Sequence, residues 1–316
     1  MLNSRTVLVT GATGFIGRHL SRKLAAEGHS VSSVQRKPEI VPGVAETLVM
    51  EELSGQEISR LLEGRRFDWV FHLASHGVRP NERSLEPMFR VNVEATRCLT
   101  VAAATWPARS FIIAGSGSEY DLARVDAPVS EDQPLEMFKL YGASKAAGSL
   151  CALSSARSLG LPTAIGRIFG VFGPGEAEHR LLPSLVRHLT RGQRVPLSDG
   201  RQRRDFLAVD DVVGALLALA HALEREPRQG VFNIGTGAPV SIRRFSEIVA
   251  SVLAAPLDLL GFGDLPSRPD DVACFSGNPS RLKAYASWRP RLSLEDGVRS
   301  AVGALAIAQQ REHADD

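Results

Sequence analysis

The fold is decided by the stretch Thr6-Val7-Leu8-Val9-Thr10-Gly11-Ala12-Thr13-Gly14-Phe15-Ile16-Gly17. Its first five residues form a β-branched, apolar run typical of a buried strand, and a helical pattern starts at residue 15. The three glycines between them have GxxGxxG spacing, which lets the backbone approach a pyrophosphate and the helix pack closely on the strand. The helix N-terminus adds free N–H groups and a positive dipole end. The stretch therefore predicts a dinucleotide-binding βαβ unit.

The first half of the chain alternates short apolar strands with longer helical segments. Continuous apolar strands separated by helices predict a parallel sheet covered on both faces. With right-handed crossovers, this becomes an α/β fold with a doubly wound Rossmann-type sheet. We expect strands at 6–10, 30–34, 68–73, 110–114 and 231–234, and helices at 15–26, 85–105 and 140–158.

After Arg167 the regular alternation of strands and helices ends, and prolines and glycines separate shorter elements. This pattern is typical of a smaller lobe that interleaves with the main one. We expect a cofactor-binding Rossmann domain at 1–167 and mainly a substrate-binding lobe at 168–316. Within the second part, about residues 206–235 are expected to return to the Rossmann sheet.

The bulk composition excludes several classes of protein. Lys and Arg total 37 against 35 Asp and Glu, so a formal charge of +2 gives no electrostatic case for nucleic acid or an anionic membrane. Cys98, Cys151 and Cys274 are widely spaced without a CxxC pair, which indicates reduced thiols and no metal site. The N-terminus lacks a signal-peptide pattern, and the most apolar run, 212–220, is too short to cross a bilayer. We expect a cytoplasmic protein.

The end of the second expected strand bears on the choice of cofactor. An acidic residue there would hydrogen-bond the ribose hydroxyls of NAD, whereas an arginine accommodates the additional phosphate of NADP. Residues 31–37 read VSSVQRK, with Arg36 backed by Ser33 and Lys37 and no acidic residue. The segment favours NADP(H) over NAD(H). An ordinary solvated loop is the alternative interpretation of Arg36 and Lys37.

A catalytic constellation follows from two further segments. Tyr141 and Lys145 are four residues apart on one face of an expected helix. Tyrosine, with a pKa of about 10, is a poor base at neutral pH, but a nearby ammonium group stabilises the phenolate. Ser116 follows the strand at 110–114, whose carboxyl end lines the ligand crevice of such a sheet. Its hydroxyl is therefore our candidate to hold a substrate carbonyl beside the tyrosine, with Ser118 in reserve.

The chain resembles the extended short-chain dehydrogenase/reductase family, in its branch of NAD(P)-dependent nucleotide-sugar epimerases, dehydratases and reductases. The likeness runs over nearly the whole length, and its later motifs are specific to the nucleotide-sugar branch. It rests on the glycine-rich start, DWVFHLA at 68–74, VNVEAT at 91–96, Ser116, YGASK at 141–145, GPG at 173–175, RDF at 204–206 with VDD at 209–211, NIG at 233–235 and WRP at 288–290.

The resemblance implies a catalytic triad of Ser116, Tyr141 and Lys145. It implies cofactor contacts from Gly11, Thr13, Gly14, Phe15, Ile16, Gly17, Arg36, Glu52 (at the adenine), Leu73, Ala74, Asn92, Tyr141 and Lys145. It implies substrate contacts from Ser116, Ser118, Arg180 and Leu181, and diphosphate contacts from Arg204 and Arg268, although each of the last two arginines could instead be a surface ion-pair partner. One departure is Gly170, where relatives often carry an asparagine that contacts the substrate.

The same resemblance reduces the number of reactions that the chain is expected to catalyse. Dehydratases of this kind use an acidic residue two positions before the tyrosine that ends the serine motif, and that position here is Ser118. Glu119 is displaced by one residue, which would turn it to the opposite side of an extended segment. We therefore expect NADPH-dependent reduction of a nucleoside-diphosphate 4-keto-6-deoxyhexose to the 6-deoxyhexose nucleotide. The alternatives are a nucleotide-sugar 4-epimerase with tightly bound NAD and a non-catalytic NAD(P)-binding regulator.

The resemblance also implies a homodimer built through a four-helix bundle. The helices concerned are the one before the serine strand and the one that carries Tyr141. Small residues at 101–104 and 146–148 suit a close approach of helices, whether between subunits or within one chain.

Overall fold

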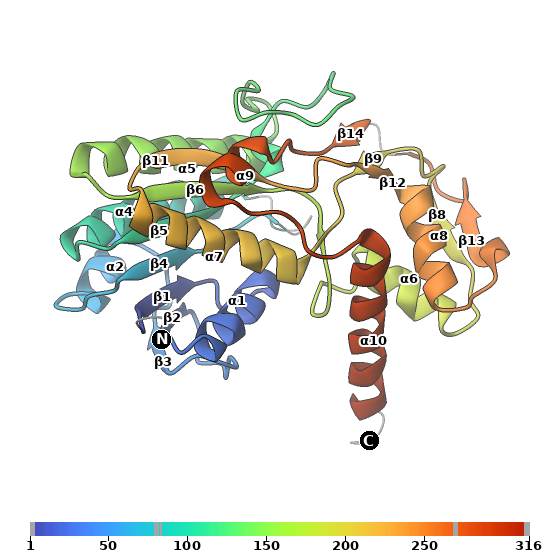
Figure 1. The fold of residues 1–316 in the computed structure, drawn as a ribbon, viewed down its shortest axis with the longest axis horizontal. Helices are drawn as coiled ribbons and strands as arrows, with labels where there is room; N and C mark the ends of the chain where they lie inside the picture. Colours follow the sequence, from blue (N-terminus) through green and yellow to red (C-terminus); the bar gives the residue numbers. More distant parts are fainter. Residues whose placement is uncertain (1–3, 79–81, 83, 268–270, 313–316) are drawn as a thin grey trace.

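The computed structural model describes residues 4–78, 82, 84–267 and 271–312. In this part of the chain a seven-stranded parallel sheet forms the centre, in the order β11-β6-β5-β4-β1-β2-β3 (Figure 1). The doubly wound α/β fold expected from the sequence is confirmed. The strands are β1 (Thr6–Thr10), β2 (Ser30–Gln35), β3 (Glu46–Val49), β4 (Trp69–His72), β5 (Ser110–Ser116), β6 (Thr163–Ile168) and β11 (Gln229–Ile234).

Helices cover both faces of this sheet because its strands are apolar on both sides. In β1, Val7 and Val9 belong to one hydrophobic core while Leu8 belongs to the other, since successive side chains of a strand point to opposite faces. One core is shared with α1 (Phe15–Ala26), α7 (Val209–Arg225) and α9 (Ser280–Ala286). The other is shared with α2 (Gly55–Leu61), α4 (Thr96–Thr105) and α5 (Leu140–Leu159).

The helix expected at 85–105 is present but is not a regular α-helix. It comprises α3 (Leu85–Phe89), a π-helical turn η1 (Arg90–Ala95) and α4. Single π-turns within helices are rare overall, but those that occur often lie at functional sites. The strands β3 and β6 and the helix α2 were not predicted, and of the four residues of β3 only Leu48 is buried. This edge strand therefore carries little hydrophobic signal.

The second half of the chain places α6 (Leu181–Leu189), β8 (Val195–Leu197), α8 (Ile242–Val252), β13 (Leu260–Phe262) and α10 (Leu294–Glu312) beside the sheet (Figure 1), and these elements share a separate hydrophobic core. Its strand β11 joins the central sheet, where it pairs with β6 in parallel. Placing a domain boundary at residue 167 stays a prediction. No helix of the described residues is long and apolar enough to cross a membrane.

The remaining elements are η2 (Gly117–Glu119), β7 (Val171–Phe172), β9 (Arg203–Arg204), β10 (Leu207–Ala208), β12 (Val240–Ser241), η3 (Leu257–Leu259) and β14 (Cys274–Phe275).

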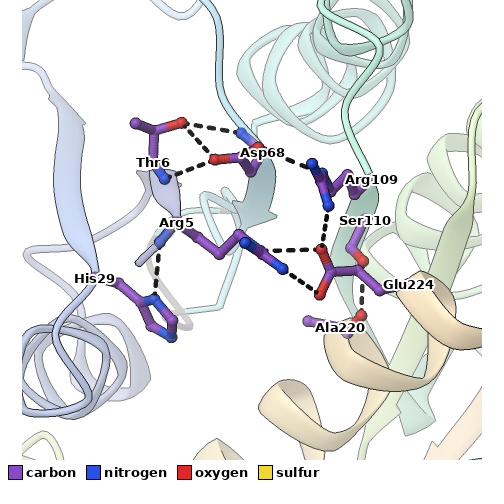
Figure 2. A network of polar contacts seen from close by, with 8 residues as sticks. All are labelled: Arg5, Thr6, His29, Asp68, Arg109, Ser110, Ala220 and Glu224. Carbon is purple, nitrogen blue, oxygen red and sulfur yellow. Dashed lines mark hydrogen bonds and ion pairs between the residues drawn. The ribbon is translucent and has the colours of Figure 1, made fainter. Parts of the chain in front are cut away.

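A polar network ties the amino ends of three strands to α7 (Figure 2). Glu224 of α7 accepts a hydrogen bond from Arg5 Nε at 3.0 Å, and its Oε1 lies 3.6 Å from Arg109 Nη1. Asp68, before β4, accepts from the backbone N–H of Thr6 at 2.9 Å. These contacts fasten the edge of the sheet where the strands begin. The opposite edge, where the strands end, carries the predicted site residues.

Helix α5 approaches the backbone of neighbouring elements closely at two glycines. A Cβ built on Gly148 would lie 1.9 Å from the carbonyl oxygen of Asn92 in η1. A Cβ built on Gly142 would lie 2.1 Å from the carbonyl oxygen of Ser118. Of the small residues noted in the sequence at 146–148, Gly148 thus serves packing within the chain, where any side chain would push α5 away.

We predict that Gly148→Ala lowers the free energy of unfolding by about 1 to 3 kcal/mol, because the methyl group has no space against the Asn92 backbone. Urea denaturation followed by circular dichroism measures the change. The matched control is Gly303→Ala in α10, where a Cβ meets nothing within 4 Å. That variant should gain up to about 1 kcal/mol from helix propensity. Equal stability of Gly148→Ala and the wild type would contradict the close packing.

Candidate active site

The turn between β1 and α1 forms a backbone cradle. Gly11 has φ of +73°, and a Cβ on it would lie 2.7 Å from the backbone N of Ala74. A Cβ on Gly17 would lie 2.1 Å from the carbonyl oxygen of Gly11. Among the described residues, no side chain caps α1 at Gly14, and its first turn contains no acidic residue. The first N–H groups of the helix thus suit an anion such as a pyrophosphate, and the predicted Thr13, Phe15 and Ile16 line the same turn.

The end of β2 is tied to this turn by side chains. Arg18 donates from Nε to the carbonyl oxygen of Thr13 at 3.0 Å and pairs with Glu39. Arg36 is exposed, directly after the buried Gln35. The Gln35 amide donates to the Ser33 hydroxyl at 2.9 Å, so that hydroxyl is engaged inside the fold and does not back Arg36. Arg36 and Lys37 are thus two adjacent exposed cations directly after β2.

The end of β4 contains a buried histidine that the sequence analysis passed over. His72 Nε2 lies 2.9 Å from Thr96 Oγ1, and its Nδ1 lies 2.7 Å from Thr10 Oγ1. Burial lowers the pKa of His72 to about 3, so the ring is neutral. Thr96 Oγ1 donates to the Asn92 carbonyl oxygen at 2.9 Å, so it accepts from Nε2. Thr10 Oγ1 also receives the backbone N–H of Ala74 at 3.3 Å, which places Leu73 and Ala74 beside the glycine turn.

The Asn92 side chain holds the loop that follows β4. Its amide nitrogen donates to the His76 carbonyl oxygen and to the Ser144 hydroxyl, each at 3.0 Å. Its amide oxygen accepts from the His76 backbone N–H at 2.9 Å and from the Ser75 hydroxyl at 3.2 Å. The amide thus has two donated and two accepted bonds within the chain. In this arrangement Asn92 supports the loop at Ser75 and His76; its own contact with the cofactor stays a prediction.

The structure brings Ser116, Tyr141 and Lys145 together. Burial raises the pKa of Tyr141, and the hydroxyls of Ser75 and Ser116, which lie beside its own hydroxyl, partly oppose the increase. Lys145, buried in α5, donates from Nζ to the Ala114 carbonyl oxygen at 2.8 Å, on the strand that ends at Ser116. Burial lowers the pKa of Lys145. A protonated tyrosine held between two serine hydroxyls is arranged to donate a proton.

The segment after Ser116 is a 3-10 turn, so the extended geometry that we expected for it is wrong. The Ser116 hydroxyl accepts the Ser118 backbone N–H at 3.1 Å, and the Glu119 carboxylate accepts the Ser116 backbone N–H at 2.8 Å. Glu119 is fully buried and paired with Arg167. It therefore points into the protein, while Ser118 remains partly exposed.

The remaining predicted residues lie on other elements. Arg180 is the residue directly before α6, its side chain caps no N–H of the helix, and its charge acts on Tyr141. Arg204 donates to the Val272 carbonyl oxygen at 2.9 Å and pairs with Asp271. Arg268 lies outside the described residues. Glu52 is exposed and accepts from Arg90 at 3.2 Å; its contact with the adenine stays a prediction.

Glu176 is a candidate that the sequence analysis missed. Its side chain is 9% exposed, and among the described residues its Oε2 has no hydrogen-bond partner. The other oxygen lies 3.7 Å from Arg180 Nε. Burial raises the pKa of Glu176 to about 7. The loop that carries it is attached to α1, since His19 Nε2 lies 2.9 Å from the Pro174 carbonyl oxygen.

Comparison with known proteins gives one family. The sequence pattern of the NAD dependent epimerase/dehydratase family matches residues 7–235. The dTDP-glucose 4,6-dehydratase of Streptomyces griseus is 30% identical, with 94% of this chain and 92% of that protein covered. The dTDP-6-deoxy-L-talose 4-dehydrogenase (NAD(P)(+)) of Kitasatospora kifunensis is 27% identical, with 96% of each covered. The structure of MoeE5 with UDP-glucuronic acid and NAD is 31% identical, with a TM-score of 0.82 over 96% of this chain and 99% of that one.

We predict that the pH dependence of stability changes in Glu176→Gln. A carboxyl with a folded pKa of about 7 against an ordinary 4.5 contributes stability below pH 4.5, and this contribution is lost as the pH rises to 7. The wild type should therefore lose roughly 3 kcal/mol relative to Glu176→Gln between pH 4.5 and 8. Chemical denaturation at several pH values measures the difference. Glu178→Gln, at a carboxylate 92% exposed, is the control, and parallel curves for Glu176→Gln and wild type would refute the burial.

Proposed function

The chain belongs to the NAD dependent epimerase/dehydratase family, and from this premise we propose that it reduces a nucleoside-diphosphate 4-keto-6-deoxyhexose to the 6-deoxyhexose nucleotide with NADPH. The observation that carries the proposal is the meeting of Tyr141, Ser116 and Lys145 at the end of β5, where the Tyr141 hydroxyl lies beside the Ser116 hydroxyl and Lys145 is bonded to Ala114. Exposed Arg36 supports NADP(H) over NAD(H). Ser118 at the position of the elimination acid argues against dehydration.

The chain's residues divide the work of such a reduction. A 4-ketone becomes an alcohol when C4 receives a hydride and the carbonyl oxygen receives a proton. The nicotinamide, when bound, supplies the hydride. The Tyr141 hydroxyl gives its proton to the C4 oxygen, and the Ser116 hydroxyl holds and polarises that carbonyl. Lys145, on the same face of α5, stabilises the resulting phenolate.

The relatives are consistent with redox chemistry at C4. The Kitasatospora relative is named a 4-dehydrogenase of a dTDP-6-deoxysugar with NAD(P)(+), and oxidation at C4 is the reverse of 4-keto reduction. The alternative is a nucleotide-sugar 4-epimerase with tightly bound NAD. It has support from MoeE5, whose structure holds NAD with UDP-glucose, and from a UDP-N-acetylglucosamine 4-epimerase of 26% identity. A reductase releases its cofactor after each turnover, whereas an epimerase retains it.

A non-catalytic regulator remains the third candidate, and it has less support because the triad is complete. We also propose that the protein acts in the cytoplasm as a homodimer. The helices α4 and α5 expose Val101 and Leu150, at 41% and 55%, which a four-helix bundle would cover. A molar mass of one chain in light scattering would contradict the dimer.

The function is tested by following NADPH and NADH with purified protein and a panel of dTDP-, GDP- and CDP-linked 4-keto-6-deoxyhexoses. We expect stoichiometric oxidation of NADPH with one member, at least tenfold faster than that of NADH, since one charge-assisted contact to the additional phosphate is worth about 1.5 to 3 kcal/mol. No net oxidation, combined with interconversion of a sugar nucleotide and its C4 epimer, would replace the reductase by the epimerase.

We predict that Tyr141→Phe lowers kcat by about 100-fold or more and leaves KM within roughly threefold, because the proton donor is lost and the ring remains. Steady-state kinetics with the preferred substrate measure both values. Tyr285→Phe is the matched control, since the Tyr285 hydroxyl donates to the Glu226 carbonyl oxygen at the surface. Unchanged turnover in Tyr141→Phe would remove Tyr141 from the reaction.

A further inference from the structure

Two charged side chains are buried directly behind the turn that carries Ser116. Glu119 is 0% exposed and Arg167, at the end of β6, is 4% exposed. Arg167 Nε donates to Glu119 Oε2 at 2.8 Å. Removing two charges from water costs several kcal/mol per ion, and apolar side chains of similar size often stabilise a fold equally well. A buried pair at this place therefore calls for an explanation other than stability.

The free oxygen of Glu119 acts on the backbone of the serine. Glu119 Oε1 accepts the Ser116 N–H at 2.8 Å, and the Ser116 hydroxyl accepts the Ser118 N–H. These reciprocal bonds close a capping box around the turn. Gly115 leaves room for the carboxylate, because a Cβ there would lie 2.7 Å from Glu119 Oε1. The orientation of Ser116 thus depends on Glu119.

Arg167 holds the carboxylate in place from the other side. Its guanidinium lies over the ring of Tyr120, 4.4 Å from the ring centre. The Tyr120 hydroxyl donates to Asn233 Oδ1 at 2.7 Å, and Asn233 is fully buried in β11. The pair is therefore attached to two neighbouring strands, which leaves Glu119 little freedom to move.

The charge of Glu119 also reaches both other members of the triad. It raises the pKa of Tyr141 and opposes the lowering of the pKa of Lys145 by burial. The groups that act on Tyr141 are the Ser75 and Ser116 hydroxyls, Glu119, and Arg180 directly before α6. Lys145 faces the Ala114 carbonyl oxygen, Glu119 and the neutral His72.

We infer that the buried Glu119–Arg167 pair is a positioning device for the triad, in which Glu119 orients Ser116 through its backbone and places a negative charge near Tyr141 and Lys145. The role of the pair in catalysis rests on the function proposed above for the triad. The effect of the Glu119 charge on the protonation of Tyr141 and Lys145 is a property of the free protein. The negative charge favours a protonated tyrosine and a protonated lysine, the forms that a proton donor and its supporting ammonium require.

Two double variants separate orientation from charge. Glu119→Gln with Arg167→Gln removes both charges and keeps an acceptor for the Ser116 N–H. Glu119→Leu with Arg167→Leu removes the charges and the acceptor. Neither variant leaves a single buried charge, which would itself threaten folding. The control is Arg5→Gln with Glu224→Gln, which removes an ion pair at the opposite edge of the sheet (Figure 2).

The charge is tested without turnover, because the chain contains three tyrosines. Incorporated 3-fluorotyrosine gives one ¹⁹F NMR signal for each, and the ortho fluorine brings ionisation into a pH range where the protein stays folded. Tyr141→Phe identifies the Tyr141 signal. In both double variants Tyr141 should ionise at lower pH than in the wild type, whereas Tyr285 and the control variant should not change. An unmoved Tyr141 titration overturns the electrostatic role.

The orientation is tested by kinetics of the same variants. The Leu pair should lower kcat about tenfold to a hundredfold relative to the Gln pair, with KM within roughly threefold, because a misplaced Ser116 weakens only the reacting complex. Equal kcat of the Gln and Leu pairs overturns the positioning of Ser116. If the wild type oxidises no cofactor with any substrate while Tyr141 still shifts in both pairs, the proposed reaction fails and the electrostatic role of Glu119 stands.

Discussion

The close approach of α5 to the backbone of its neighbours is the constraint on which the candidate site depends. Gly142 lies against Ser118 and Gly148 against Asn92, so the helix is seated on the serine turn at one point and on the π-turn at another. Tyr141 and Lys145, one helical turn apart, are positioned by these two contacts. The π-turn that contains Asn92 also lets its amide bond Ser144 on α5. The packing of α5 on the serine turn and on the π-turn therefore sets the position of Tyr141 relative to Ser116.

Charge is distributed around this helix in a way that suits proton donation. His72 is buried and neutral, Lys145 is buried with a carbonyl partner, and Glu119 provides a buried negative charge. Burial then raises the pKa of Tyr141. The tyrosine of the free protein is therefore protonated at neutral pH.

The parts of the site that the sequence predicted are those that depend on local spacing. The glycine turn needs only its own residues and the strand before it, and the Tyr141–Lys145 pair needs only a helix. The rest depends on contacts between distant segments. Glu119 turns inward because its carboxylate meets Arg167, 48 residues later, and a strand-like alternation does not foresee a 3-10 turn. Glu176 is buried only because its loop is attached to α1. The pairing of Arg204 with Asp271 likewise joins segments 67 residues apart.

Packing restricts Gly117, the residue before the position of the elimination acid, to glycine. Gly117 lies against Phe169 and Phe275, and a Cβ there would lie 2.7 Å from a Phe169 ring carbon. Any side chain at this position would displace the aromatic cluster that supports the serine turn. Ser118, the next residue, is held through its backbone by the Ser116 hydroxyl. The only carboxylate in this turn, Glu119, is committed to the interior. The turn therefore orients a serine and buries a charge, and it places no carboxylate at position 118.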